Sequence, residues 1–162
     1  MDSGLKLNGD YFLELSENGI VTQTLDIKNL IVNEGLGYVL SLIGGASPTN
    51  LYVVPTANAY TALGTDTLAS ILTSAGEVTA YSATSRPQWS GIATGTTIDN
   101  SVSLATFAFT GSGSVNGILI CTQGTKGSST GKAYSYVALS TAFGFTSTAS
   151  LAVKYSTTAS SI

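Results

Sequence analysis

Alternation of apolar and polar residues predicts that most of this chain forms strands. The clearest example is the segment 149–155, where Ala149, Leu151, Val153 and Tyr155 fall on one face and small or polar residues on the other. Similar apolar segments, separated by Gly, Ser and Thr, occur at 51–54, 77–82, 88–92, 102–109, 115–122 and 133–139. They predict an all-β fold, an antiparallel β-sandwich of jelly-roll-like topology, although their spacing does not give the strand order.

The first thirty residues alternate in the same way and contain two Asn-Gly pairs, Asn8-Gly9 and Asn18-Gly19. Asn-Gly favours the tight turns of hairpins, so this segment predicts a short β-meander with a turn at each pair. So few strands are not stable alone, and the meander must lie on the main domain or on a neighbouring subunit. We therefore divide the chain into an N-terminal β-meander or arm, 1–30, and a β-sandwich domain, 31–162.

One short helix and one still shorter helical turn interrupt the strand pattern. Asn33 is a suitable N-cap, Glu34 suits a first helical turn, and Gly44-Gly45 ends a run of apolar residues at helical spacing: Leu36, Val39, Leu40 and Ile43. A second, shorter helical turn is predicted over 65–72. Helices of about ten residues are marginal in water alone, so we expect each to pack against a sheet.

Composition indicates a surface that is partly covered by partners. Charged residues make up 9% of the 162 residues, with a net charge of −3, whereas about 25% is usual in soluble domains. A surface so poor in charge favours association; the alternative is a secreted module rich in Ser and Thr. The six bases are scattered singly, which argues against nucleic-acid binding.

No apolar run approaches the length of a membrane span, so no membrane association is expected. The start, residues 1–7, has neither the basic leader nor the apolar centre of a secretory signal peptide, so we expect synthesis in a cytoplasm.

The chain has no histidine, which excludes imidazole-based catalysis and imidazole metal sites. Three carboxylates, Asp66, Glu77 and Asp99, are isolated in sequence and do not predict a catalytic pair. The segment 97–101 lacks the acids of a calcium loop and suits an Asx-turn, and 124–129 lacks the spacing of a phosphate loop. We expect a protein that is not an enzyme and has no cofactor.

Other residues have a structural and a functional interpretation. Cys121, in an apolar run, is expected to be a small buried residue. Arg86 and Trp89 form either an anchor for a partner or sugar, or a tryptophan that closes one end of the sandwich with Arg86 packed over it. A polar loop at 123–131 is expected to be a solvated hairpin tip.

From about Leu30 to Tyr155 the chain resembles small structural proteins of tailed-phage virions. The segments that carry this resemblance are 31–38, 77–82 with 86–89, 98–101, 105–109, 117–121 and 124–127. Capsid decoration or cement proteins of this kind are small β-sandwiches that lie on the outer shell as homo-oligomers and hold neighbouring capsomers together. The residues before Leu30 lie outside the resemblance.

The resemblance implies a virion protein at the capsid surface, whose partners are the major capsid protein lattice and further copies of itself, as a homodimer or homotrimer. It brings no catalytic residues. Two alternatives are a tail, fibre or baseplate component, and a carbohydrate-binding module for host attachment, with Trp89, Tyr81 and Tyr60 as candidate sugar contacts. Candidate residues for the partner interface are Tyr11, Phe12, Leu13, Arg86 and Trp89.

Overall fold

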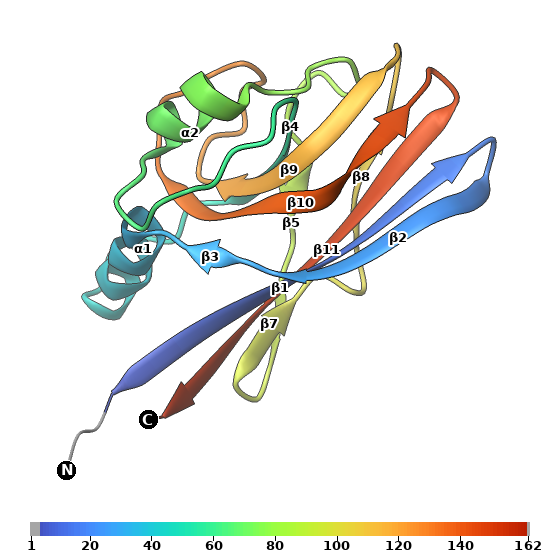
Figure 1. Cartoon of the computed structure of the whole chain (residues 1–162). Coiled ribbons are helices and arrows are strands. Elements are labelled where there is room, and N and C mark those ends of the chain that lie inside the picture. The colour runs from blue at the N-terminus through green and yellow to red at the C-terminus, as the bar shows by residue number, and fades with distance from the viewer. Residues whose placement is uncertain (1–3, 162) are drawn as a thin grey trace.

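Two antiparallel sheets face each other across a shared core, with one helix over a sheet and another at the edge of the sandwich (Figure 1). The computed structural model describes residues 4–161; residues 1–3 and 162, the ends of the two predicted segments, lie outside the described residues. Every strand pairing within these residues is antiparallel. The predicted all-β antiparallel sandwich is therefore confirmed.

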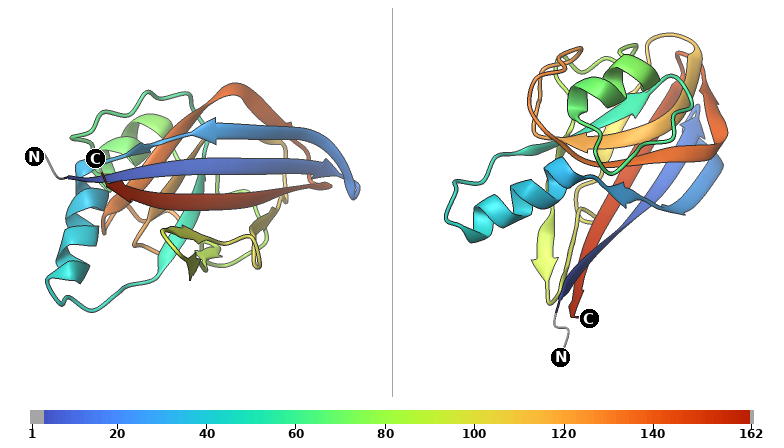
Figure 2. Two further views of the ribbon diagram at one scale, coloured as in Figure 1. Left: turned by 90° about the horizontal axis from the view of Figure 1, so that it is seen from below. Right: turned by 60° about the vertical axis from the view of Figure 1, so that its left-hand side comes forward.

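The first sheet is built around the N-terminal and C-terminal strands. Its order is β2 (Ile20–Lys28), β1 (Leu5–Glu17), β11 (Ala149–Ser161), β7 (Thr97–Asp99) and β6 (Ile92–Thr94), and β8 (Ala105–Ala108) also pairs with β11. Leu5 pairs with Ser161 and Glu17 with Ala149, so β1 and β11 run side by side along their whole length. The two ends of the described chain consequently lie together (Figure 2).

The second sheet has the order β3 (Leu30–Ile31), β10 (Ala133–Phe145), β9 (Gly113–Cys121), β4 (Leu51–Thr56) and β5 (Gln88–Trp89). The helix α2 (Leu68–Ala75) covers its outer face, where Leu68, Ile71 and Ala75 pack against Leu119 and other buried residues. The helix α1 (Asn33–Ile43) follows β3, contacts β10 and extends past the edge of the sandwich (Figure 2).

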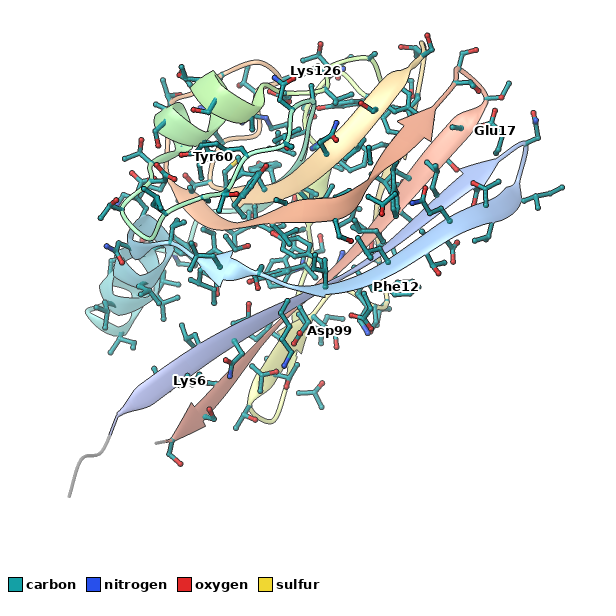
Figure 3. All side chains as sticks on the ribbon, in the orientation of Figure 1. Lys6, Phe12, Glu17, Tyr60, Asp99 and Lys126 are labelled. Atoms are coloured by element: carbon teal, nitrogen blue, oxygen red, sulfur yellow. The ribbon has the colours of Figure 1, made fainter. Side chains whose placement is uncertain are left out.

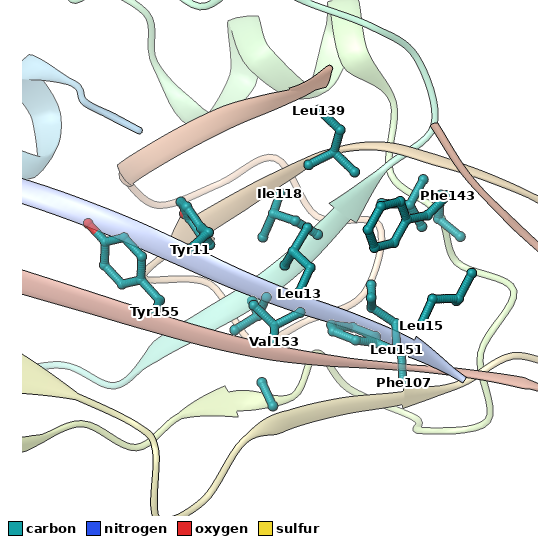
Figure 4. Packing of buried hydrophobic residues seen from close by; sticks show 14 of the residues in the cluster. Tyr11, Leu13, Leu15, Phe107, Ile118, Leu139, Phe143, Leu151, Val153 and Tyr155 are labelled. Carbon is teal, nitrogen blue, oxygen red and sulfur yellow. The ribbon is translucent and has the colours of Figure 1, made fainter. Parts of the chain in front are cut away.

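The main core fills the space between the sheets. All four residues predicted to share one face of the last strand, Ala149, Leu151, Val153 and Tyr155, are buried there. Side chains from both sheets meet them, including Leu13, Phe107, Ile118 and Phe143 (Figure 4). The alternation seen in the sequence thus identified the core face of β11 correctly.

The N-terminal segment belongs to this same core. Tyr11 and Leu13 of β1 are fully buried, so β1 and β2 are strands of the sandwich. The residues on the two sides of the boundary predicted at residue 30 share one hydrophobic core. Asn18 and Gly19, both with positive φ, form the predicted turn. Asn8-Gly9 forms no turn, and β1 continues through it. The glycine is needed there for close packing, because a side chain at Gly9 would overlap Asn29 and the Tyr155 hydroxyl.

Three other local predictions differ from the structure. The segment 77–82 forms no strand; it crosses from one sheet to the other, with single bridges between Glu77 and Thr56 and between Tyr81 and Phe109. The N-cap of α1 is Val32 rather than Asn33, so no side chain caps this helix. The second helix lies three residues later than its predicted start, where Thr67 accepts a hydrogen bond from the Ser70 amide at 3.2 Å.

Candidate functional site

A groove with mostly apolar walls opens between α1, the strands β4 and β5, and the β6–β7 hairpin. Its volume is about 520 Å³ and none of its sixteen lining residues is charged. The apolar and aromatic side chains in the lining are Tyr38, Val39, Leu42, Leu51, Trp89, Ile92, Ile98, Val102 and Tyr134.

The first turn of α1 fixes the helix as one wall of this groove. Gly35 lies so close to β10 that a Cβ atom there would overlap the backbone carbonyl of Tyr134. The Glu34 carboxylate accepts hydrogen bonds from the amides of Ala133 (2.8 Å) and Leu68 (3.1 Å). At the other end of the groove the Tyr38 hydroxyl donates to the Thr49 carbonyl (2.8 Å) and accepts from the Thr49 amide (3.0 Å). The helix and the following loop are thus anchored to the sandwich.

Trp89 forms the floor of the groove. Its indole Nε1 donates to the Tyr155 carbonyl oxygen at 3.0 Å, and its ring meets the Tyr155 ring edge to face, with centroids 5.9 Å apart. Gly91 lets the β6–β7 hairpin lie against it, because a Cβ atom at Gly91 would overlap the Trp89 ring and come within 2.7 Å of Ile98 Cγ2. Trp89 is therefore held rigidly, with part of its surface exposed.

Exposed apolar side chains continue from the groove across the outer side of α1. Leu36, Leu40 and Ile43 project there, and Leu40 and Ile43 are 65% and 72% exposed. On the opposite rim, Val102 is 79% and Ile92 55% exposed. We call the groove lining together with Leu36, Leu40 and Ile43 the α1 surface.

The packing of α1 corrects the sequence prediction. Leu36, Val39, Leu40 and Ile43 were expected to pack against a sheet, but of these only Val39 does. The helix packs through the neighbouring stripe of Gly35, Tyr38 and Val39, on which Leu42 lines the groove. Both stripes have helical spacing, and only the contact at Gly35 decides between them. α1 is consequently apolar on its packed side and on its exposed side.

Charged side chains gather on a different surface. Six of them lie on the outer face of β2, β1 and β11. They occupy even-numbered positions, which point away from the core in these strands: Lys6, Asp10, Glu14, Asp26, Lys28 and Lys154. A hollow of about 820 Å³ on this face is lined in part by Asp10, Asp26, Lys28 and Lys154. It is larger than the groove beside α1, but its charges suit contact with water.

The predicted interface residues of the N-terminal segment lie on both sides of β1. Tyr11 and Leu13 are fully buried, and the Tyr11 hydroxyl hydrogen-bonds the Ser135 hydroxyl at 2.7 Å. Phe12 points away from the core into the charged hollow and is 37% exposed (Figure 3). Of these three residues, only Phe12 offers its side chain to a partner.

Arg86 is also buried, and its partners all belong to the same chain. Its guanidinium pairs with the Glu77 carboxylate at 2.6 Å and donates to the carbonyls of Ser128 (2.7 Å) and Gln123 (2.9 Å). Burial disfavours the charge, but the hydrogen bond to Glu77 and the charges of the groups around the guanidinium together outweigh it, and the pKa of Arg86 lies above its ordinary value. Arg86 thus holds loops together and does not pack over Trp89 as the structural interpretation supposed.

The loop 123–131, expected to be solvated, is anchored through its centre. The Gly127 amide donates to Glu77 at 2.8 Å, and Lys126 Nζ donates to the Tyr81 carbonyl at 2.9 Å while lying 3.8 Å from the centre of the Tyr81 ring. Several of its other residues, including Thr125 and Ser129, remain exposed.

The three isolated carboxylates each have local partners. Asp66 accepts from the Leu63 amide (2.7 Å) and from the Tyr60 hydroxyl (2.8 Å), and the Leu63 hydrogen bond holds its pKa below the usual range. Asp99 accepts from the Ser101 amide at 2.7 Å, which is the predicted Asx-turn. Within residues 4–161, no three Cys, Asp or Glu side chains gather as they would around a metal ion.

Neither helix of the described chain has the length and apolar character needed to cross a membrane. Trp89 is the one predicted interface residue that lines the groove, and the exposed leucines of α1 were not predicted as contacts.

Comparison with protein-family models, with curated proteins and with solved structures finds no match to this chain.

Proposed function

We propose that this chain is a non-enzymatic structural component of a larger protein assembly, into which it is incorporated through the α1 surface. The observation that carries the proposal is an exposed apolar helix face continuous with an apolar groove, with no charged side chain in either. A helix that is apolar on nearly all sides normally lies buried. Contiguous apolar surface on a folded domain is typical of sites where proteins bind one another.

The position of the charges supports the same assignment. The outer face of β2, β1 and β11 carries both acids and bases, which keep it hydrated, whereas the α1 surface has no charged residue. Six of the fifteen charged residues of the chain lie on that face, and none lines the α1 surface, so covering the α1 surface dehydrates no charged side chain. Binding a partner at the α1 surface removes apolar area from water and does not dehydrate any charged side chain.

The assembly that we favour is a capsid shell, on which the chain acts as a decoration or cement protein. This choice rests on the sequence resemblance. Its mechanism is mechanical: each bound copy adds contacts that must break before neighbouring capsomers separate, so binding raises the stability of the shell. A tail, fibre or baseplate component is the second candidate, since it would use an apolar surface of the same kind to assemble along an axis.

The structure gives less support to a carbohydrate-binding module. Its three candidate aromatic residues do not share an exposed face: Tyr81 is buried, and Trp89 packs on Tyr155 in the main core. Tyr60 packs on Tyr136 beneath α2, and its hydroxyl is bound to Asp66.

The experiment that tests the proposal compares particles made with and without this chain. Under the capsid assignment, particles that lack it assemble with normal geometry but open at a lower temperature, and purified chain added back restores their resistance. Shells of unchanged resistance, together with loss of tail assembly or host adsorption, would move the assignment to the tail. Particles unaffected in both respects would contradict a structural role.

A further inference from the structure

The outer stripe of α1 has the form of a helix that packs against another helix. Leu36, Leu40 and Ile43 follow the i, i+4, i+7 spacing of anchor residues, over a helix about 16 Å long. The one charged residue of α1, Glu34, is bound to two backbone amides of its own chain. Nothing charged along this stripe therefore has to be dehydrated when a partner covers it.

The same surface combines a projecting helix face with a depression. The helix is a ridge, and the groove beside it, about 520 Å³ in volume, is a depression of the same apolar character. In a twofold contact each patch meets its own copy, so any charge near the axis faces a like charge. A patch without charges avoids that repulsion, and a ridge next to a groove allows each copy to place its ridge on the other.

The extent of the α1 surface also suits a stable dimer. Sixteen residues line the groove, and three more project from the outer side of the helix. This is close to the roughly 20–30 residues that each partner contributes to an interface of standard size. The charged face of β2, β1 and β11 remains outside such a contact and available to water or to the rest of the assembly.

We propose that the α1 surface binds a second copy of this chain, so that two α1 helices pack antiparallel across a twofold axis, each against the groove of its partner. This inference rests on the proposed function, and it identifies a second copy of the chain as a partner that binds at the α1 surface. Two linked copies would attach to a repetitive assembly more tightly than one, because the second contact becomes intramolecular.

Sedimentation of the purified chain tests this proposal. The wild type is expected to be a dimer at tens of micromolar, and Leu40→Lys a monomer, with a dissociation constant at least about 100-fold higher because two lysines face each other near the axis. Ile20→Lys is the matched control: Ile20 is 70% exposed, and it lies on the β1–β2 hairpin at the opposite end of the molecule from α1 (Figure 1). It should remain a dimer, and circular dichroism should show both variants folded.

A second measurement does not depend on adding charge. Cys121 is buried, so Leu40→Cys supplies an accessible thiol in the middle of α1. Mild oxidation should link two copies of Leu40→Cys and should not link Ile20→Cys. Equal cross-linking of both variants would overturn the twofold pairing, as would a trimeric wild type.

A monomeric wild type would overturn the inference without removing the proposed function. If that monomer still bound particles, and Leu40→Lys abolished the binding, the α1 surface would be the contact to the assembly itself. If the wild type were a dimer but neither bound nor stabilised any particle, the pairing would stand and the proposed function would fail.

Discussion

Two glycines in α1 have opposite environments although they are only two residues apart. A methyl group at Gly35 would overlap the backbone of Tyr134, which cannot move without displacing β10, whereas the position of a methyl group at Gly37 has no other atom within 4 Å. Gly35→Ala should therefore lower the free energy of unfolding by about 1–3 kcal/mol. Gly37→Ala should raise it by about 0.5–1 kcal/mol, because alanine loses less backbone entropy in a helix.

Urea unfolding of both variants measures this difference. Equal effects of the two substitutions would mean that α1 does not contact β10 as described. The comparison matters for the proposed interface, because the contact at Gly35 directs Leu36, Leu40 and Ile43 outward.

Buried tyrosines predict how stability depends on pH. Burial, with the neighbouring Tyr134, raises the pKa of Tyr155 to about 12, and burial raises the pKa of Tyr11 well above its ordinary value. A folded-state pKa above the unfolded value of about 10 means that the unfolded chain loses its proton first as the pH rises. Stability is then fully present below about pH 10 and is lost between pH 10 and 12, by roughly 2–3 kcal/mol for Tyr155.

Urea unfolding between pH 8 and pH 12 checks this expectation. Tyr155→Phe removes one of the ionising groups and should lose less stability over the same range than the wild type. Parallel pH profiles for the two proteins would show that Tyr155 does not ionise as described.

At the scale of elements, substitutions in β1 test whether the N-terminal segment is a strand of the core. Leu13 is fully buried, and the adjacent Phe12 points outward. Leu13→Ala should lower the free energy of unfolding by about 2–5 kcal/mol, through lost burial and the cavity left behind. Phe12→Ala should cost less than about 1 kcal/mol, because that side chain is partly exposed and lies outside the core.

Thermal and denaturant unfolding would compare the two variants. If Leu13→Ala were as harmless as Phe12→Ala, the first thirty residues would be an arm separate from the sandwich. The structure instead predicts that removing residues 1–28 unfolds the domain, because it deletes β1 and β2 and leaves β11 without its longest partner strand.

The elements that the sequence predicted well are those whose pattern depends on local contacts. Alternation identified the buried face of β11, and the apolar spacing with Gly44-Gly45 located α1. The turn predicted at Asn8-Gly9 does not form, because the glycine there is required by the close approach of Asn29 and Tyr155, which lie 20 and 146 residues away in sequence. Strand order depends on such distant contacts and was not predictable from spacing.

The candidate site was predicted less well for the same reason. Tyr11 and Leu13 lie on the core face of β1, and which face is buried depends on its pairing with β11. Arg86 is fixed by Glu77 and by two carbonyls of a distant loop. The exposed stripe of α1 carried a signal that its sequence could have shown: residues 35, 38, 39 and 42 and residues 36, 40 and 43 both have helical spacing, so one stripe had to remain uncovered.

At the scale of the whole molecule, one surface of the chain is charged and another is apolar. The outer face of β2, β1 and β11 holds six charged residues of both signs, and the α1 surface holds none. Under the proposed function, the charged face remains in contact with water while the α1 surface offers apolar area to a partner, although only 9% of the residues of the chain are charged. This asymmetry predicts that a charge introduced on α1 affects assembly far more than the same change at the β1–β2 hairpin.

The most direct test of the central claim adds purified variants back to particles that lack this chain and measures the temperature at which the particles open. The account predicts that the wild type and Ile20→Lys restore the opening temperature of complete particles, whereas Leu40→Lys, equally folded, leaves it at the value of the deficient ones. Restoration by Leu40→Lys at the same concentration as the wild type would contradict the claim that the α1 surface incorporates this protein into its assembly.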